Sequence, residues 1–373
     1  MKIGFDAKRL FNNFTGLGNY SRFVVKALAD HYPDNEYRLY SPKIKSSSDT
    51  EFFFHQNTIS LKKPHGLQAK LGGVWRSYCL GNVAARDQVQ VFHGLSNELP
   101  VTKPNGLKTI VTIHDVIYKR YPAFYKPVDR AIYDFKFKKA CESADQIIAV
   151  SEQTARDVID FLKADAKKVK VIYQGCHPVF HVKYSQEQIQ SVKQKYHLPD
   201  QFILNVGTIE SRKNALLILK ALALMQEKVT LVVAGRATSY QQELNQFIQA
   251  NKLNDQVQFI HNASFTDLPL IYQSARAFVY PSFFEGFGIP IVEAIASGLP
   301  VVSSKGSCFA EAGGADCLYI DPHSPEDLAS AILDVWRNEA NVKQRVLRSQ
   351  QYIQRFEPKV IASELMNIYR SLV

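Results

Sequence analysis

Short apolar runs alternate with helix-like segments along most of this chain, and that alternation limits the folds available to it. In the first half we expect strands at Lys2–Asp6, Val89–His93, Thr109–His114 and Gln146–Val150, with a helix at Asn19–Asp30. Apolar strands separated by amphipathic helices are typical of parallel sheets that carry helices on both faces. The first half therefore predicts a doubly wound α/β domain.

The same alternation restarts after a change of composition at Tyr173–Asp200. The second series of expected strands and helices comprises Phe202–Val206, Asn214–Gln226, Val229–Ala234, Tyr240–Asn251, Gln256–Ile260 and Ala277–Tyr280. Ligands of doubly wound sheets bind beyond the carboxyl ends of the strands. The sequence therefore predicts an α/β protein of two Rossmann-like domains facing a central cleft.

A length of 373 residues fits two domains. We expect a first domain at 1–175, a linker at 176–200 and a second domain at 201–355. A last helix is expected at Pro358–Leu372, within the C-terminal segment 356–373, after two helical segments that follow Ser324. The position of this helix allows it to pack back on the first domain.

Composition excludes several classes of protein. No apolar run approaches the ~20 residues that span a bilayer, and the charges in MKIGFDAKRLF do not fit a secretory signal. The five cysteines are scattered, which favours reduced thiols in a cytoplasmic protein over a structural zinc site. The chain holds no G-x-x-x-x-G-K-[ST] motif for ATP and no D-x-D motif for a metal-bound nucleotide.

The net charge of +10 is unevenly distributed. Residues 1–180 hold 27 Lys and Arg against 17 Asp and Glu, whereas residues 181–373 hold 18 of each kind. The basic half either faces an anionic partner, such as a phospholipid surface, or is simply a solvated basic face. The segment Lys126–Lys139 fits a peripheral contact with the inner face of the plasma membrane and a solvated helix equally well. No nucleic-acid-binding module is visible, so we expect no nucleic acid partner.

The stretch FFEGFGIPIVEAIASGLPVV places two carboxylates in an otherwise small and apolar setting. Pro290 fits the first turn of a helix, which would place Glu293 in that first turn and leave Glu285 on the preceding loop. Phe287 looks exposed between its two glycines. The backbone amides of Gly286–Ile289 can donate to sugar or phosphate oxygens, and the carboxylates can accept from paired hydroxyls.

Two other motifs lie where a predicted strand meets a predicted helix. In GTIESRKN, which begins at Gly207, Arg212 and Lys213 stand at a helix start, where the dipole disfavours cations. A guanidinium beside an ammonium suits a diphosphate, so we prefer a bound anion to two exposed cations. In TGLGNY, Gly16 and Gly18 either admit an anion or form a plain turn.

A histidine also ends each of two predicted strands. His114 begins the His–Asp pair of IHDV, at a position suited to touch a ligand. For His93, in FHG, a structural role is the better interpretation.

Taken in order, these motifs resemble those of the retaining glycosyltransferases of family 4, which have the GT-B fold. The resemblance covers nearly the whole chain, from TGLGNY and IHDV through AVSEQT to NVGTIESRKN and FVYPSFFEGFGIPIVEAIASGLPVV. It implies catalytic roles for Arg212 and Lys213 on the donor diphosphate, Glu285 on donor-sugar hydroxyls, and His114 beside the sugar. The implied donor-binding residues are Gly16, Gly18, Gly207, Gly286, Phe287, Gly288, Ile289 and Glu293, the last on the ribose.

The resemblance also implies the reaction. A hexose would pass with retention from a nucleotide sugar to a glycan or lipid-linked glycan, with no metal and no cofactor. The motifs most resemble bacterial mannosyltransferases of surface-polysaccharide synthesis, which favours GDP-mannose over a UDP-sugar. The segment CFAEAGGAD departs from the family pattern at Phe309 and Ala310, which leaves base and sugar selectivity open. A non-catalytic nucleotide-sugar sensor on the same fold is the alternative.

Overall fold

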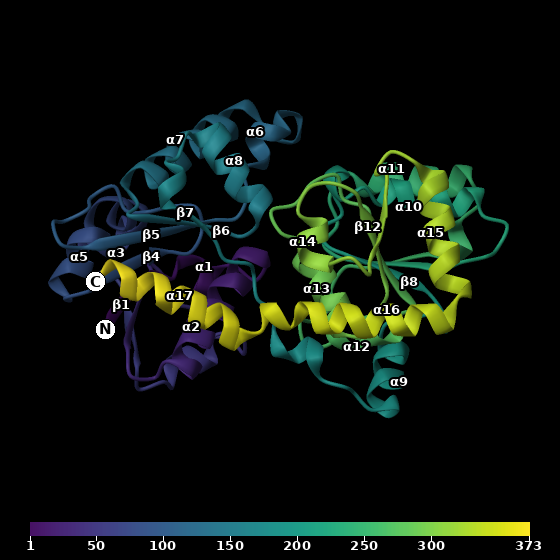
Figure 1. Cartoon of the computed structure of the whole chain (residues 1–373), viewed down its shortest axis with the longest axis horizontal. Helices are drawn as coiled ribbons and strands as arrows, with labels where there is room; N and C mark the ends of the chain where they lie inside the picture. The colour runs from purple at the N-terminus through teal and green to yellow at the C-terminus, as the bar shows by residue number, and fades with distance from the viewer. The chain divides into compact units, whose positions relative to one another are not determined.

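The computed structural model describes residues 1–373, except for the side chains of residues 67 and 339. The chain divides into two compact units. Unit 1 comprises Met1–Gly175 together with Phe356–Val373, and unit 2 comprises Cys176–Arg355. Both units consist of a parallel sheet with helices packed on its two faces (Figure 1).

Unit 1 holds a seven-stranded parallel sheet in the order β3-β2-β1-β4-β5-β6-β7. Its strands are β1 (Lys2–Asp6), β2 (Glu36–Tyr40), β3 (Ile59–Lys62), β4 (Val91–Gly94), β5 (Lys108–Ile113), β6 (Gln146–Ala149) and β7 (Val169–Val171). Its α-helices are α1 (Lys8–Asn12), α2 (Gly16–His31), α3 (Leu67–Lys70), α4 (Gly72–Val74), α5 (Leu80–Arg86), α6 (Ile117–Arg120), α7 (Pro127–Ser143), α8 (Glu152–Leu162) and α17 (Pro358–Leu372). A π-helical turn, η2 (Trp75–Cys79), joins α4 to α5.

The two faces of this sheet build separate cores because successive side chains of a strand point to opposite sides. On β5, Ile110 packs with the helices α2 and α17, whereas Val111 and Ile113 pack under α7 and α8. Phe92 of β4, which shares a face with Val111, packs under α5. Helices α5 and α7 therefore cover the same face of the sheet.

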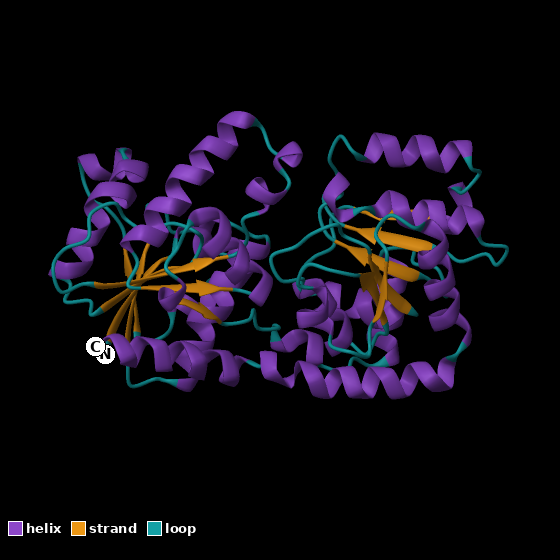
Figure 2. Ribbon diagram, turned by 45° about the horizontal axis from the view of Figure 1, so that its top comes forward, coloured by secondary structure: helices purple, strands orange, loops and turns teal.

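The last helix, α17, packs on α2 and belongs to the core of unit 1. Ile361, Leu365, Met366 and Tyr369 are buried at helical spacing along one side of it. Burying each such side chain is worth about 1.5–3 kcal/mol, so this contact fixes the C-terminal segment firmly. Figure 2 shows helices flanking the strands in each unit.

Unit 2 holds a six-stranded parallel sheet in the order β10-β9-β8-β11-β12-β13. Its strands are β8 (Ile203–Val206), β9 (Leu231–Ala234), β10 (Val257–Ile260), β11 (Ala277–Tyr280), β12 (Val301–Ser304) and β13 (Leu318–Ile320). Its α-helices are α9 (Gln186–Lys195), α10 (Ala215–Leu224), α11 (Gln241–Ala250), α12 (Leu268–Ser274), α13 (Ile289–Ala296), α14 (Phe309–Gly313), α15 (Pro325–Arg337) and α16 (Glu339–Tyr352).

The predicted fold class, two doubly wound parallel α/β domains, is confirmed in each unit. The range expected to be a linker, residues 176–200, lies in unit 2, where α9 packs on α12. Across the described part of the chain, none of the helices has the length and apolar character needed to cross a bilayer.

Candidate active site

The charged part of the site lies where the strand order of unit 2 reverses direction. There β8 and β11 are neighbours, and later strands are added outward on either side of them. Loops after the carboxyl ends of two such strands are where doubly wound sheets bind ligands. The loop after β8 contains η6 (Ser211–Lys213), and the loop after β11 contains Glu285.

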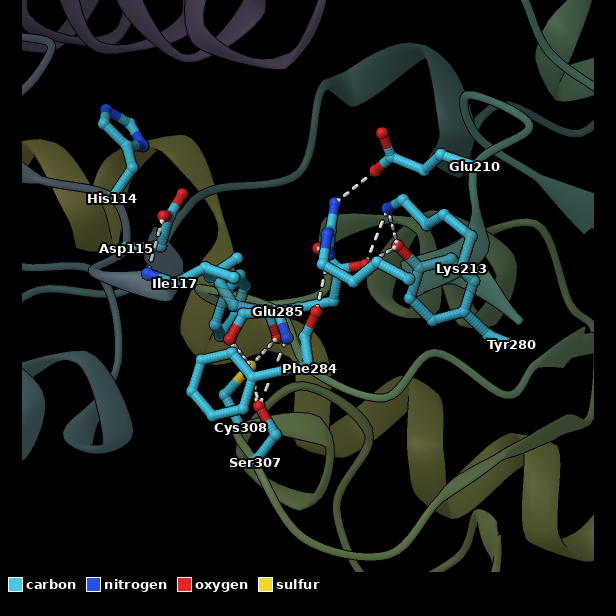
Figure 3. Close-up of polar contacts among 12 residues, drawn as sticks. His114, Asp115, Ile117, Glu210, Lys213, Tyr280, Phe284, Glu285, Ser307 and Cys308 are labelled. Carbon is cyan, nitrogen blue, oxygen red and sulfur yellow. Dashed lines mark hydrogen bonds and ion pairs between the residues drawn. The ribbon is translucent and has the colours of Figure 1, made fainter. Parts of the chain in front are cut away.

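Arg212 and Lys213 both contact the Glu285 carboxylate. Arg212 Nη1 lies 2.8 Å from Glu285 Oε2, and Lys213 Nζ lies 2.7 Å from Glu285 Oε1. The Tyr280 hydroxyl donates to the same Oε1 at 3.0 Å and accepts from Lys213. Figure 3 shows Lys213, Tyr280 and Glu285 converging from separate elements. The structure therefore brings together three of the four residues predicted to be catalytic.

Glu285 is buried and yet ionised. Burial favours the neutral acid, but the charges of Arg212 and Lys213 outweigh it and lower the pKa of Glu285 to about 2. Arg212 also pairs with Glu210 at 2.6 Å and donates to the Phe284 carbonyl at 2.6 Å. Two cations and two carboxylates leave the cluster with no net charge.

The carboxylates that pair with Arg212 and Lys213 weaken the sequence-based prediction of a bound anion, which rested on two unpaired cations at a helix start. Arg212 and Lys213 lie in a 3₁₀ turn just before α10, and Glu285 and Glu210 already neutralise them. Their position alone therefore does not demand an anion. Each side chain is still 14% exposed, so both can exchange a carboxylate oxygen for a phosphate oxygen of similar geometry.

Gly207 directly follows β8, beside this cluster. Its φ of +144° is a conformation that residues with a Cβ rarely adopt, and a Cβ there would lie 3.4 Å from Lys213 Cε. Its N–H donates to the Ala234 carbonyl at 3.0 Å. In this structure the glycine therefore permits the backbone turn after β8 and leaves space for the Lys213 side chain.

Two residues that the sequence analysis missed hold the loop that carries Glu285. Ser307 Oγ accepts from the Glu285 N–H at 3.3 Å and lies 3.2 Å from the Glu285 carbonyl oxygen. Cys308 Sγ donates to the carbonyls of Glu285, at 3.2 Å, and Phe287, at 2.9 Å. Both residues follow β12, and the 22-residue separation of Ser307 from Glu285 means that no local motif could reveal the contact.

The loop after Glu285 differs from the prediction at Phe287. This side chain is only 2% exposed, because it turns inward while its carbonyl bonds Cys308. Gly288 caps α13 with φ of +99°, and Pro290 lies in the first helical turn as predicted. In the first turn of α13, Pro290 has no N–H and the Ile291 N–H donates to the Gly288 carbonyl at 2.9 Å. Ile289 therefore carries the first amide of the helix that a ligand oxygen could reach.

Glu293 lies beyond the first turn of α13, so its predicted position in that turn is wrong. The helix begins at Ile289 rather than later, which moves Glu293 a full turn along it. The Tyr272 hydroxyl donates to Glu293 Oε2 at 3.2 Å. Burial raises the pKa of Glu293 to about 7, and the Tyr272 hydrogen bond and the Lys213 charge only partly oppose that shift.

His114 lies in unit 1, directly after β5, with both ring nitrogens bonded. Its Nε2 lies 2.9 Å from the Leu95 carbonyl, and its Nδ1 lies 3.1 Å from Gln174 Nε2. Burial lowers the pKa of His114 to about 4, so the ring is neutral at pH 7. Its backbone carbonyl accepts from Thr154 at 3.4 Å. His114 is thus built as a fixed, neutral group rather than as a proton carrier.

The predicted helix begins at Asn19, which would leave both glycines of TGLGNY in the loop before it. In the structure the helix begins earlier, and both glycines lie in the first turn of α2. A Cβ at Gly18 would come within 1.7 Å of the Asn13 carbonyl oxygen, so close packing requires this glycine. A Cβ at Gly16 would meet nothing within 4 Å. Of the two, only Gly16 has open space in which a ligand could approach.

A metal centre has no obvious ligand set within the described residues, since no group of three or more His, Cys, Asp or Glu side chains there could hold an ion. The site instead offers the guanidinium of Arg212, the ammonium of Lys213, the ionised carboxylate of Glu285 and the start of α13. Such a set binds phosphate oxygens through the cations and hydroxyl groups through the carboxylate.

Family models match both units of the chain. Residues 15–179 match the family described as Glycosyltransferase Family 4, and residues 186–352 match Glycosyl transferases group 1. An O-antigen chain mannosyltransferase B of Escherichia coli is 27% identical over 362 residues, which cover 92% of this chain and 94% of that one. The serotype-specific mannosyltransferase WbdA of Escherichia coli is 31% identical over 293 residues, 74% of this chain but 35% of its own length.

Solved structures share the fold over the full length of the chain. Anabaena Alr3699/HepE in complex with UDP-glucose aligns with a TM-score of 0.77 at 18% identity, and the match covers 100% of both chains. WaaG, a glycosyltransferase involved in lipopolysaccharide biosynthesis, aligns with a TM-score of 0.72 at 16% identity, covering 99% of both chains. At these identities the likeness shows the fold alone.

Proposed function

Because the chain belongs to the glycosyltransferases of family 4 and group 1, we propose that it transfers a hexose from a nucleoside diphosphate sugar to a glycan or lipid-linked glycan acceptor. We propose further that the transfer retains the anomeric configuration and needs no divalent metal. The observation that carries the proposal is the ion-paired cluster of Arg212, Lys213 and Glu285 at the strand-order reversal of unit 2.

Arg212 and Lys213 would hold the diphosphate of the donor. Cleavage of the bond between the anomeric carbon and the phosphate oxygen places an extra negative charge on the departing nucleoside diphosphate. Cations fixed beside that oxygen stabilise the charge as it develops, which is the largest single contribution in many enzymes. Both cations bond to Glu285, and Lys213 also bonds to Tyr280; each would exchange part of its contact with Glu285 for a phosphate oxygen.

Glu285 would accept hydrogen bonds from hydroxyls of the transferred sugar. With a pKa near 2 it is a carboxylate at neutral pH, so it can accept protons in hydrogen bonds but cannot donate one. This protonation state favours a binding role and argues against a general acid. In the retaining reaction, the acceptor hydroxyl would bond to the anomeric carbon and pass its proton to the leaving phosphate oxygen.

The remaining predicted residues would each offer a contact to the donor. Glu293 would bind the ribose diol, and the amides from Gly286 to Ile289 would donate to the sugar or the phosphate. Gly16 would allow a phosphate to approach unit 1, while Gly18 keeps its packing role. His114 would present a neutral, fixed surface beside the sugar.

We favour GDP-mannose as the donor and surface polysaccharide as the product. The support is that relatives covering most of this chain are named O-antigen or serotype-specific mannosyltransferases. The UDP-glucose in the HepE structure belongs to a protein of 18% identity, and it makes UDP-sugars the donors to test against.

A thermal-shift panel tests the donor assignment. The purified chain is melted with GDP, UDP, GDP-mannose and UDP-glucose, each with EDTA present. A ligand that binds only the folded state raises the melting temperature by mass action. We expect GDP and GDP-mannose to give the largest shifts, unchanged by EDTA. Shifts that require added Mg²⁺ would overturn the metal-independent proposal, and larger shifts with UDP ligands would overturn the choice of base.

A further inference from the structure

The outward face of α7 carries large apolar side chains that the fold does not cover. Val128 is 69% exposed, Ile132 46% and Phe135 69%, and their spacing of four and three residues places them on one side of the helix. Phe137, Ala140 and Cys141 occupy the opposite side and pack into unit 1. A surface helix normally presents polar residues where these three lie.

Basic side chains border this apolar face. Lys136, Lys138 and Lys139 follow Phe135 and are each about half exposed. They pair with Glu98, Asp134 and Glu142, but exposed pairs of this kind are worth under about 1 kcal/mol and exchange readily with other anions. Residues 117–143 hold seven Lys or Arg against three Asp or Glu, a net charge of +4.

A second uncovered apolar group lies in the same layer of unit 1. It consists of Leu71, Val74, Tyr78 and Val101, all exposed, in and beside the α4–η2 segment. The Val101 N–H donates to the Ser77 carbonyl at 2.7 Å, which ties the group together.

The two apolar groups lie on one side of unit 1. Helices α5 and α7 cover the same face of the sheet, and Leu99 packs against the cores beneath both. Glu98 bonds Lys136 of α7 and Arg76 of η2, which joins the two segments directly. In Figure 1, α7 lies at the upper edge of unit 1.

We infer that this surface, the outward face of α7 with the Leu71–Val101 group, docks on an anionic phospholipid bilayer. A helix with apolar and aromatic residues between lysines lies in the plane of a membrane interface, where its apolar side chains enter the acyl boundary and its cations meet phosphates. Each cation near an anionic leaflet adds about 1 kcal/mol. A second copy fits less well, because a two-fold contact would place the +4 segment against itself.

The charge distribution of the whole chain supports this occupant. The excess of basic residues lies entirely in the first 180, whereas the donor cluster of unit 2 is neutral. The donor site therefore does not account for the basic half. An anionic membrane does, and it would also present a lipid-linked acceptor, although docking does not depend on the proposed transfer.

Vesicle flotation with the full chain tests the inference. Vesicles of phosphatidylcholine are compared with vesicles containing about a third phosphatidylglycerol, at low and high salt, because salt screens the electrostatic part. We expect the chain to float with the anionic vesicles only, and less at high salt. We expect Ile132→Ser with Phe135→Ser, and separately Lys138→Glu with Lys139→Glu, each to lower the bound fraction about tenfold.

Matched variants in unit 2 serve as controls. Leu347→Ser changes a side chain that is 60% exposed, and Lys220→Glu with Lys228→Glu makes the same charge change elsewhere. Both should float as the unaltered chain does, and all variants should keep its melting temperature. Equal losses in the controls, or no flotation of the unaltered chain, would overturn the proposal. So would a dimer that the α7 variants convert to monomer without any vesicle binding, because a second copy would then cover the face.

Discussion

The two units place polar side chains near the carboxyl ends of their central strands, but the two sets differ in charge. In unit 1, His93 Nδ1 lies 2.7 Å from the Tyr369 hydroxyl, and His93 Nε2 lies 2.8 Å from Thr112 Oγ1. Thr112 in turn lies 3.1 Å from the Tyr20 hydroxyl. Burial lowers the pKa of His93 to about 3, so the whole network is neutral at pH 7.

In unit 2, the corresponding set consists of charged side chains that share partners. Glu285 lies between Arg212 and Lys213, so either cation can move to a new anion without becoming unpaired. A neutral network whose members are all bonded mainly stabilises the fold, whereas shared ion pairs can exchange with a ligand. The excess of basic residues lies in the first 180 residues, whereas the proposed donor cluster in unit 2 carries no net charge, so the two features need separate explanations.

Glu285→Gln is the substitution with the largest expected effect. It removes the anion that competes for Arg212 and Lys213 while keeping the side chain's shape, so we expect GDP to bind as tightly or more tightly. The transfer rate should fall by a factor of about 100 or more, because the carboxylate that would hold the sugar hydroxyls is lost. Calorimetric titration with GDP and a transfer assay measure the two effects.

Glu210→Gln is the matched control, since Glu210 pairs with Arg212 alone and is more exposed than Glu285. It should change both quantities less than about threefold. If Glu285→Gln lowered GDP affinity and transfer equally, the exchange model would be wrong. The nucleotide-sugar sensor would then be the better interpretation.

The sequence was sufficient where the cause of structure is local. Lys2–Asp6, Ala277–Tyr280 and Pro358–Leu372 have the predicted bounds, because a strong apolar pattern ends at polar or turn-forming residues. The strand Ile59–Lys62 was missed, since every residue in it is only partly buried. Long-range contacts were also missed.

The inward turn of Phe287 and the pairing of Arg212 with Glu285 each depend on a neighbouring strand loop. Local patterns carry no information on such contacts. The charged residues of the site could therefore be proposed from the sequence, but their mutual pairing could not.

Ser307 offers the next largest effect, because its backbone is strained. Its φ of +50° favours glycine, so Ser307→Gly relieves strain while it removes the hydrogen bonds to Glu285. We expect both Ser307→Gly and Ser307→Ala to lower transfer about tenfold, because the Glu285 loop is held less firmly. Only the alanine variant should lose about 1 kcal/mol of unfolding free energy. Unchanged transfer in both variants would exclude a positioning role for Ser307.

Glu293 predicts a pH dependence of stability. Its pKa in the fold, about 7, lies above the ordinary value of 4.5, so the folded state favours the protonated acid. The stability that the protonated acid contributes is fully present below pH 4.5 and is lost as the pH rises through 7. Glu293→Gln removes that loss and keeps an acceptor for Tyr272. We expect the variant to gain about 2–3 kcal/mol over the unaltered chain between pH 5 and pH 8, measured by urea unfolding. An equal difference at both pH values would contradict the assignment.

Tyr369→Phe tests the neutral network of unit 1, and its effect should be the smallest on function. The substitution leaves His93 Nδ1 buried without the hydroxyl that it contacts, which costs about 1–2 kcal/mol of unfolding free energy. GDP affinity should not change, because Arg212 and Lys213, the residues proposed to hold the diphosphate, pair with Glu210 and Glu285, whereas Tyr369 bonds His93. Tyr78→Phe, which removes an exposed hydroxyl from the same unit, should alter neither quantity. Loss of GDP affinity in Tyr369→Phe with unchanged stability would mean that the network of unit 1 contributes to ligand binding rather than to the stability of the fold. The proposed difference between the two units would then be wrong.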